Sequence, residues 1–450
     1  MPASKADVIE KKVQQSGLFG KFKAYLKALG PGLISGASGD DPSGIGTYSQ
    51  TGAQFGYAQL WTAVFTFPLQ AAIQEICARI ALQTGRGLAA NIRKYYSKPT
   101  LYFYVSLLVI ANTINLGVDL GAMAAAAQML FGLPVLLWLA VITIVSAALQ
   151  IFIPYQRYSK VLQVLTLALL AYILTAFFTS QDWVQALRNT VIPTIRFDRS
   201  YLFNLVAILG TTITPYMFFW QASQEVEEEI DEGKLTETER KGVSKVELKW
   251  MRADVGFGSF ISNLVFWFIV VTTASTLNQN GITNIDSAQQ AAEALRPLAG
   301  DSAYILFGVG IIGTGLLAVP VLAGSAAYAI AETFKFRQGL SEKPHHARRF
   351  YAVIGLVILV GAAINLTGIN PISALYYVAV LNGMIAPPLL FMIMLISSNK
   401  KIMQSKTNGR ASNILGWVVT TVMGVAAIAL LVSLVMGQYA SDRRIIRETV

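Results

Sequence analysis

The sequence predicts an all-α integral membrane protein of eleven transmembrane helices, in which the first and sixth helices are broken. Three observations predict this class. The 450 residues are 54% hydrophobic and only 13% charged, which is about half the charged fraction of an average soluble domain. Apolar stretches of about 20 residues, the length that crosses a bilayer, recur along the chain. Proline together with acidic residues or glycine interrupts the first and the sixth of these stretches.

The apolar stretches divide the chain into three parts. We expect a cytoplasmic N-terminal segment at 1–28, a transmembrane domain at 29–437 and an extracellular tail at 438–450. The eleven predicted spans are 29–50, 56–82, 100–130, 133–152, 158–179, 201–226, 252–277, 302–333, 350–367, 371–396 and 413–437.

The distribution of lysine and arginine predicts the orientation of these spans. Of the 35 basic residues, 28 fall in alternate connections on one side of the predicted membrane. Basic connections stay in the cytoplasm, so we expect the N-terminus inside, the C-terminus outside and a plasma-membrane location. The net charge of +10 is therefore accounted for by the topology signal of a membrane protein. We expect the lipid bilayer, and no nucleic acid, as a partner.

The first span (29–50) breaks on two carboxylates. Asp40 and Asp41 lie in the middle of apolar sequence and are followed by Pro42 and Gly44. An ionised side chain is costly in hydrocarbon and marks a pathway or ligand site, and proline removes a helical hydrogen bond. We therefore expect an unwound segment whose carbonyls and carboxylates face a cavity, as in the cation sites of transporters. An extracellular loop mistaken for a span is the alternative.

The sixth span (201–226) is interrupted at a comparable depth, between Gly210 and Tyr216 with Pro215 inside. Interruptions in the first and sixth spans suggest a repeat of five helices, spans 29–179 and 201–396, with inverted topology and one extra helix at 413–437. Paired broken helices are the best pointer from sequence to a binding site. A plain proline kink at Pro215 is the alternative reading.

Several blocks of the sequence resemble the Nramp family of divalent metal transporters. Gly30–Tyr57 looks like the first helix and following loop of that family, and Gln83–Leu88 resembles the end of its second helix. Leu130–Pro134 resembles its third turn, and Arg348–Arg349 the start of its ninth helix. The resemblance extends over nearly the whole chain, and implies a LeuT-like fold with a 5+5 inverted repeat that works by alternating access.

The resemblance also implies a metal site with two altered ligands. Asp41 keeps the position of the charged ligand, whereas Gly44 stands where the family has an asparagine ligand. The backbone carbonyl of Thr211 matches a family ligand, and Thr214 replaces the family's methionine. The soft sulfur is therefore missing at that position.

Residues that the resemblance links to proton movement are altered too. Tyr216 and Gln221 stand at the positions of two family histidines. The family's acidic pair in the third helix falls on Leu116 and Asp119, so one of the two acids is lost. Tyr216, Gln221 and Asp119 remain candidate cavity residues, and Asn382 in the tenth span is a further one.

Two other acids in the spans have open roles. Asp40 could bind the ion directly, act through water, form a gate or pair with a cation. Glu75 could belong to the pathway, or it could form an ion pair with Arg79, four residues later on the same helix. Asp40, Glu75 and Asp119 are the acids left to carry a proton.

The altered ligands favour a hard, partly hydrated cargo. Carboxylate, hydroxyl and carbonyl oxygens suit Mg²⁺ and Mn²⁺, and Mg²⁺ tends to keep several waters. We expect Mg²⁺, with Mn²⁺ also admitted, which resembles the magnesium-transporting branch related to Nramp proteins. The membrane potential supplies about 2.3 kcal/mol per charge per 100 mV, so transport need not be coupled to protons. We expect a monomer with no cofactor and no enzymatic activity.

Two other functions fit parts of the same pattern. A Na⁺- or H⁺-coupled carrier of a small organic substrate would use the same scaffold, and the paired acids would favour a cationic substrate. An intramembrane aspartyl hydrolase would need two facing aspartates, for which only Asp41 and Asp119 suggest themselves.

Overall fold

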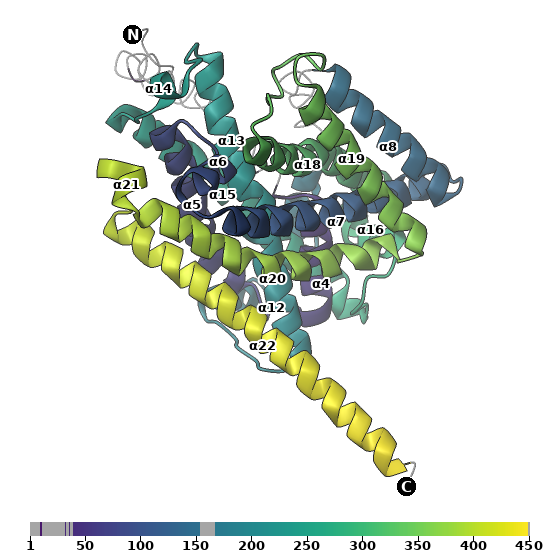
Figure 1. The fold of residues 1–450 in the computed structure, drawn as a ribbon. Coiled ribbons are helices and arrows are strands. Elements are labelled where there is room, and N and C mark those ends of the chain that lie inside the picture. Colours follow the sequence, from purple (N-terminus) through teal and green to yellow (C-terminus); the bar gives the residue numbers. More distant parts are fainter. Residues whose placement is uncertain (1–9, 11–31, 33–35, 37–38, 154–166, 449–450) are drawn as a thin grey trace.

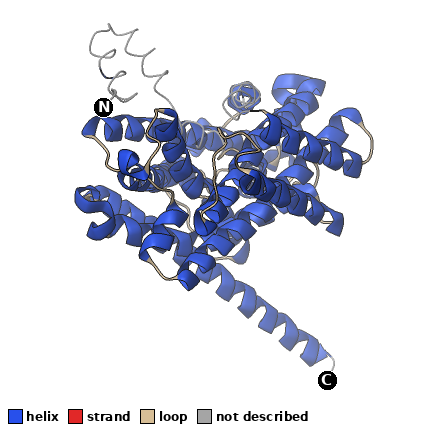
Figure 2. Cartoon of the chain, turned by 45° about the horizontal axis from the view of Figure 1, so that its top comes forward, coloured by secondary structure: helices blue, strands red, loops and turns tan. Residues whose placement is uncertain are grey.

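The computed structural model describes residues 10, 32, 36, 39–153 and 167–448 of the chain. All regular structure in these ranges is helical, as Figure 2 shows. Most helices pack into one body, and α22 (Arg410–Glu448) extends from it toward the C-terminus (Figure 1). The all-α class predicted from composition is therefore confirmed.

The helices correspond to the predicted spans in order. The first and fifth spans contain α4 (Pro42–Phe55) and α10 (Leu170–Phe178), and the others contain α5 (Trp61–Thr84), α7 (Lys98–Phe131), α8 (Val135–Phe152), α12 (Arg199–Thr212), α13 (Pro215–Asp231), α15 (Lys245–Thr276), α18 (Ala303–Phe334), α19 (Arg348–Ile364), α20 (Pro371–Ser398) and α22. Short helices lie between them, namely α6 (Leu88–Tyr95), α11 (Trp183–Val191), α14 (Glu237–Arg240), α16 (Ala288–Ala292), α17 (Arg296–Ala299) and α21 (Lys400–Met403).

Eight stretches of the described chain are long and apolar enough to cross a membrane. Predicted spans 29–50, 56–82 and 158–179 are not among them. The first and the third of these lie partly outside the described residues, and α5 carries Glu75, Arg79 and several glutamines that lower its mean hydropathy. The count of eleven spans therefore stays a prediction.

Both predicted breaks are present. Residues 39–41 are not helical, and α4 begins at Pro42 with Asp41 as its N-cap. Proline fits the first helical position because its missing N–H has no partner there. The second break leaves residues 213 and 214 outside α12 and α13, so Pro215 starts a new helix and does not merely kink one.

Close packing of small residues joins α12, which ends at the second break, to α20. A Cβ atom on Gly210 of α12 would lie 2.0 Å from the carbonyl oxygen of Ala379 and 2.2 Å from the nitrogen of Gly383, both on α20. The backbones of the two helices therefore touch, as small residues allow in membrane bundles. Figure 1 shows α4, α12 and α20 side by side in the middle of the molecule.

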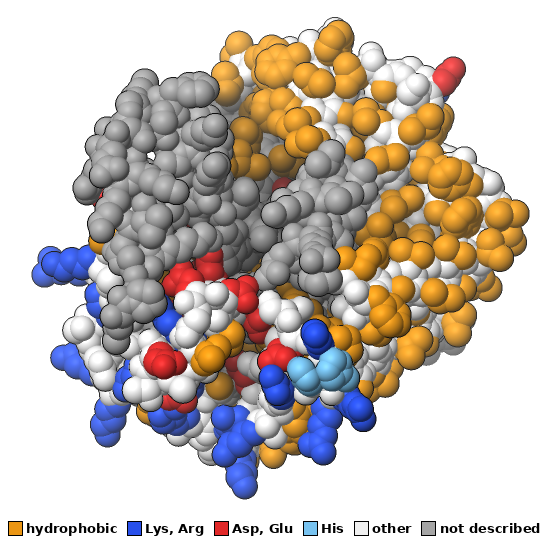
Figure 3. All heavy atoms as spheres, turned by 90° about the horizontal axis from the view of Figure 1, so that it is seen from above, with side chains coloured by type: hydrophobic (Ala, Val, Ile, Leu, Met, Phe, Trp, Pro, Cys, Tyr) orange, Lys and Arg blue, Asp and Glu red, His pale blue; other side chains and the backbone are white. Residues whose placement is uncertain are grey.

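The surface is that of a protein surrounded by lipid. Large apolar side chains are exposed on the outer helices, including Phe103, Ile144, Leu359 and Ile428. In Figure 3, lysine and arginine side chains gather on one side of the view and hydrophobic side chains cover the opposite side. A bilayer solvates such apolar surface, which water does not.

Candidate metal site

The carboxylate of Asp41 lies at the start of α4 and is only 1% exposed. Its Oδ1 accepts hydrogen bonds from the Ser43 hydroxyl and from the Gly44 backbone N–H, both at 2.7 Å. Its Oδ2 accepts from the Tyr216 hydroxyl at 3.1 Å and from the Asn115 amide at 3.3 Å. Four donors and the N-terminal end of a helix all stabilise negative charge at this point. Because Asp41 is buried among helices, the reading of Asp40 and Asp41 as an extracellular loop is wrong.

Three oxygen atoms converge where Gly44 has no side chain. The position that a Cβ atom on Gly44 would take lies 3.0 Å from the Gly39 carbonyl oxygen, 3.4 Å from Thr211 Oγ1 and 3.5 Å from Asp41 Oδ1. Thr211 Oγ1 is buried and has no hydrogen-bond partner among the described residues. Carbonyl, hydroxyl and carboxylate oxygens are the ligands that hard divalent cations prefer.

Thr214 lies in the sixth-span break and is the N-cap residue of α13. Its hydroxyl makes no capping hydrogen bond to α13. Thr214 Oγ1 is buried and, within the described part of the chain, unpaired. A buried hydroxyl without a partner is costly, so the oxygens of Thr211 and Thr214 are available to a ligand at the break.

Asn115 on α7 joins three of the predicted site residues, and sequence reasoning missed it. Its Nδ2 donates to Asp41 Oδ2 and, at 3.0 Å, to Asp119 Oδ2. Its Oδ1 accepts from Asn382 Nδ2 of α20 at 2.6 Å. Its position four residues before Asp119 places both on one helical face, a signal that was present in the sequence. Asp41 and Asp119 are therefore bridged by an amide.

Asp40 turns away from Asp41. Its Oδ1 accepts a hydrogen bond at 3.0 Å from Ser262 of α15, whereas the partners of Asp41 lie on α4, α7 and α13. Asp40 is 3% exposed. The unwound backbone thus directs two neighbouring carboxylates to different helices, and the role of Asp40 stays a prediction.

A thioether lies at the first break although Thr214 replaces the family's methionine. A Cβ atom on Gly39 would be 3.3 Å from the Sδ atom of Met217, which is buried in the first turn of α13. Comparison at position 214 alone could not find Met217, because the sulfur reaches the break from a residue three positions later.

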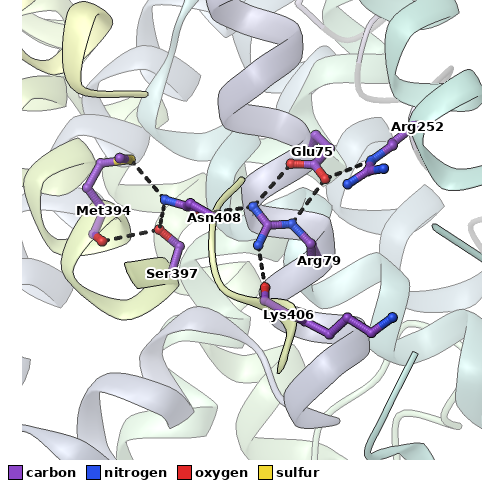
Figure 4. A network of polar contacts seen from close by, with 7 residues as sticks. All are labelled: Glu75, Arg79, Arg252, Met394, Ser397, Lys406 and Asn408. Carbon is purple, nitrogen blue, oxygen red and sulfur yellow. Dashed lines mark hydrogen bonds and ion pairs between the residues drawn. The ribbon is translucent and has the colours of Figure 1, made fainter. Parts of the chain in front are cut away.

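Gln221 and Glu75, two residues predicted to line the pathway, have partners other than Asp41. The Gln221 amide donates to Glu225 Oε1 at 2.8 Å, one turn farther along α13. Glu75 forms the ion pair with Arg79 that was the alternative reading, at 3.0 Å, and a second with Arg252 of α15 at 3.0 Å. Figure 4 shows this network, which continues from Arg79 to the Lys406 carbonyl and Asn408.

The described residues contain no group of three or more histidine, cysteine, aspartate or glutamate side chains that could hold a metal ion. A cation at the break would therefore meet Asp41 and mostly neutral oxygens. The structure brings together four predicted site residues directly, namely Asp41, Gly44, Thr211 and Tyr216. Asn382 and Asp119 join them through Asn115.

Comparison with protein families and curated proteins gives one consistent result. The family described as natural resistance-associated macrophage protein-like (Nramp) matches residues 32–433. The divalent metal cation transporter MntH of Klebsiella pneumoniae (strain 342) is 26% identical over 418 residues, with 92% of this chain and 95% of the relative covered. MntH of Yersinia pestis (strain Pestoides F) is 28% identical over 418 residues, with 91% and 96% covered.

Solved structures show the same fold. The Eremococcus coleocola manganese transporter, crystallised with an aromatic bis-isothiourea compound, matches with a TM-score of 0.72 at 16% identity, covering 93% of this chain and 88% of that one. Mhp1, a nucleobase-cation-symport-1 family transporter, matches with a TM-score of 0.54 at 14% identity, covering 92% and 93%. The predicted LeuT-like fold is confirmed. Since the family match extends over residues 32–433, the chain belongs to the Nramp family.

Proposed function

We propose that this protein carries a divalent metal cation into the cytoplasm by alternating access, with Asp41 as the charged ligand. The observation that supports this most directly is the convergence of Asp41, Thr211 and the Gly39 carbonyl on the gap at Gly44. The curated relatives are named divalent metal cation transporters, and the related solved structure is that of a manganese transporter. Family membership and site chemistry thus favour the same class of cargo.

The cargo that fits this site best is Mg²⁺, with Mn²⁺ also carried. The three oxygens around Gly44 are hard ligands, which suit an ion such as Mg²⁺. Met217 adds a thioether beside Gly39, which supports the transport of the softer Mn²⁺.

Transport is not coupled to protons in this proposal. Tyr216 donates a hydrogen bond to Asp41 where the family has a histidine, and Asp119 has the buried apolar Leu116 where the family has a second acid. A divalent cation gains roughly 4.6 kcal/mol from a potential of 100 mV, which is sufficient for accumulation. The ion is cargo, the protein carries no resident cofactor and catalyses no reaction, and the monomer is the transporting unit.

The proposed membrane arrangement keeps the N-terminus in the cytoplasm and the C-terminus outside, in the plasma membrane. The basic connections support this orientation, because 28 of 35 lysine and arginine residues fall on the cytoplasmic side. The inverted repeats at 29–179 and 201–396 move around the fixed site at the two breaks.

Uptake into proteoliposomes tests cargo and coupling together. Purified protein is reconstituted, a negative potential is imposed inside, and Mg²⁺, Mn²⁺ and Ca²⁺ fluxes are followed with a pH dye in the lumen. We expect Mg²⁺ and Mn²⁺ uptake without a change of luminal pH. Acidification driven by the metal would contradict uncoupled transport. No flux of any divalent cation through folded protein would favour the organic-substrate carrier, a class that shares this scaffold.

The selectivity of the site provides a separate prediction at Thr214. Replacing Thr214 with methionine should raise the transport of Cd²⁺ and Mn²⁺ relative to Mg²⁺ by about tenfold, since a soft thioether takes the place of a hydroxyl. Competition of each ion against Mg²⁺ uptake measures the ratio. Thr214→Val, which removes the hydroxyl without adding sulfur, is the matched control. Unchanged selectivity in Thr214→Met would mean that Thr214 does not face the ion.

A further inference from the structure

A polar cavity lies along α4, on the side of Asp41 that leads toward Phe55. Its volume is about 180 Å³. Its lining includes Ile45 and Gly46, about one turn beyond Asp41 on α4. Gln54 lies 13 residues beyond Asp41, which corresponds to about 20 Å of helix. In the proposed orientation this cavity lies between the candidate metal site and the outside.

The outer wall of the cavity is held by hydrogen bonds. The side chain of Gln50 on α4 donates to the Thr283 carbonyl at 3.1 Å and accepts from the Ile285 N–H at 2.9 Å. Asn370, the N-cap of α20, donates to the Asp286 carbonyl at 2.9 Å. The segment 283–286 is thus fastened to two helices that form the metal site, and the cavity is preformed.

The lining of the cavity suits a cation. Among the described residues of the lining, Asp286 is the only charged one, and none is lysine or arginine. Asn284 donates to Asp286 Oδ1 at 2.7 Å, and both residues are exposed to solvent. Other oxygen-bearing side chains of the lining are Ser49, Gln50, Gln54, Ser373, Tyr376 and Tyr377. One fixed negative charge among neutral oxygens raises the local concentration of cations.

The size of the cavity points to a hydrated ion. The volume of 180 Å³ is well above the roughly 10–15 Å³ that one water needs, so the cavity admits a cation together with several of its waters. Mg²⁺ keeps several waters and is usually bound through only one or two carboxylates. A single carboxylate with hydroxyl and amide neighbours meets that requirement.

We propose that this cavity is an outer binding site for a hydrated divalent cation, with Asp286 as its charged ligand. The ion binds there through its water shell before it loses water and moves to Asp41. The identity of the ion rests on the proposed function, whereas the site itself rests on the cavity, its lining and the fixed segment 283–286.

Transport kinetics test the contribution of Asp286. Asp286→Asn should raise the KM for Mg²⁺ uptake about tenfold and leave kcat unchanged, because only capture of the ion is affected. Asp301→Asn is the matched control, since it removes an exposed carboxylate that does not line the cavity. Equal changes in the two variants would reduce the effect to surface charge and overturn the proposal.

Direct binding separates this proposal from the proposed function. Mn²⁺ binding to purified protein is followed by electron paramagnetic resonance, with Mg²⁺ as competitor, in Asp41→Asn and in Asp41→Asn/Asp286→Asn. We expect one weak site in the single variant and none in the double variant. Absence of a site in the single variant overturns the outer site even if the wild type transports Mg²⁺. A weak site that depends on Asp286, in a protein that transports no divalent cation, supports the outer site and rejects the proposed cargo.

Discussion

Replacing Asp41 with asparagine is expected to abolish uptake of every divalent cation that the wild-type protein carries. Asp41 supplies a carboxylate oxygen at the gap where Gly39 and Thr211 oxygens converge. Removing one partner of a buried, hydrogen-bonded charge pair costs about 2–5 kcal/mol, which corresponds to about 30- to 4,000-fold in affinity. The amide is also uncharged, so the favourable attraction for a divalent ion is lost in an environment of low dielectric constant.

Asparagine is the appropriate substitute because the local fold should survive it. Its Oδ1 can still accept hydrogen bonds from Ser43 and from the Gly44 N–H, so the N-cap of α4 is kept. Asn and Asp are about equally good N-caps. The amide Nδ2 of asparagine cannot accept the hydrogen bonds that Tyr216 and Asn115 donate to Asp41, whereas alanine would lose these bonds and the cap as well, which mixes loss of binding with loss of stability.

Radioisotope or fluorescent uptake into proteoliposomes measures the effect, together with the elution profile of the purified variant. Asp40→Asn is the internal control, because Asp40 contacts Ser262 on α15 and not the gap at Gly44. We expect Asp40→Asn to retain measurable uptake. If Asp41→Asn transported Mg²⁺ or Mn²⁺ at the wild-type rate, Asp41 could not be the charged ligand.

The breaks in the first and sixth spans were predictable because their causes are local. Pro42 and Gly44 follow two carboxylates, and Pro215 follows a run of threonines, so helical hydrogen bonds are lost and an interruption is favoured in both segments. The end of α22 was not predicted. The apolar sequence stops near residue 437, but the helix continues to Glu448, since charged residues such as arginine and glutamate are good helix formers.

The partners of the site were only partly predictable, because they depend on how helices face one another. The family resemblance placed Asp41, Gly44, Thr211 and Tyr216 in one site, and these residues do meet. Nothing in the sequence pairs Asp40 with Ser262, which is 222 residues away. Such contacts arise from packing of glycine-rich helix faces, and a pattern of residues along one helix carries no information on the neighbour.

Packing also explains why Glu75 gave an ambiguous signal. A buried acid in a spanning helix indicates either a pathway or an ion pair, and the ion pair is what the structure contains. Glu75 and Arg79 side chains are only 10% and 3% exposed, and their two contacts are 3.0 and 3.3 Å long. Arg252, whose side chain is 55% exposed, forms the third member of the network.

Glu75→Leu is accordingly expected to lower the free energy of unfolding by about 3–5 kcal/mol, because it leaves the Arg79 charge buried without a carboxylate. Arg252→Gln should cost only about 0–1 kcal/mol, since that pair is exposed to solvent. Chemical denaturation of the detergent-solubilised protein measures both. The double variant Glu75→Leu/Arg79→Leu should recover part of the loss, because it removes both charges together.

Transport by the same variants decides whether Glu75 also serves the pathway. If Glu75 only joins α5 to α15 and to the segment around Lys406 and Asn408, uptake per folded molecule should stay near the wild-type value in Glu75→Gln. This variant keeps the size and a hydrogen-bonding oxygen for Arg79 while it removes the titratable group. Loss of uptake in Glu75→Gln, with the free energy of unfolding unchanged, would instead assign the carboxylate a part in ion movement. A small loss of stability in Glu75→Leu would show that the Lys406 carbonyl and Asn408 alone satisfy Arg79.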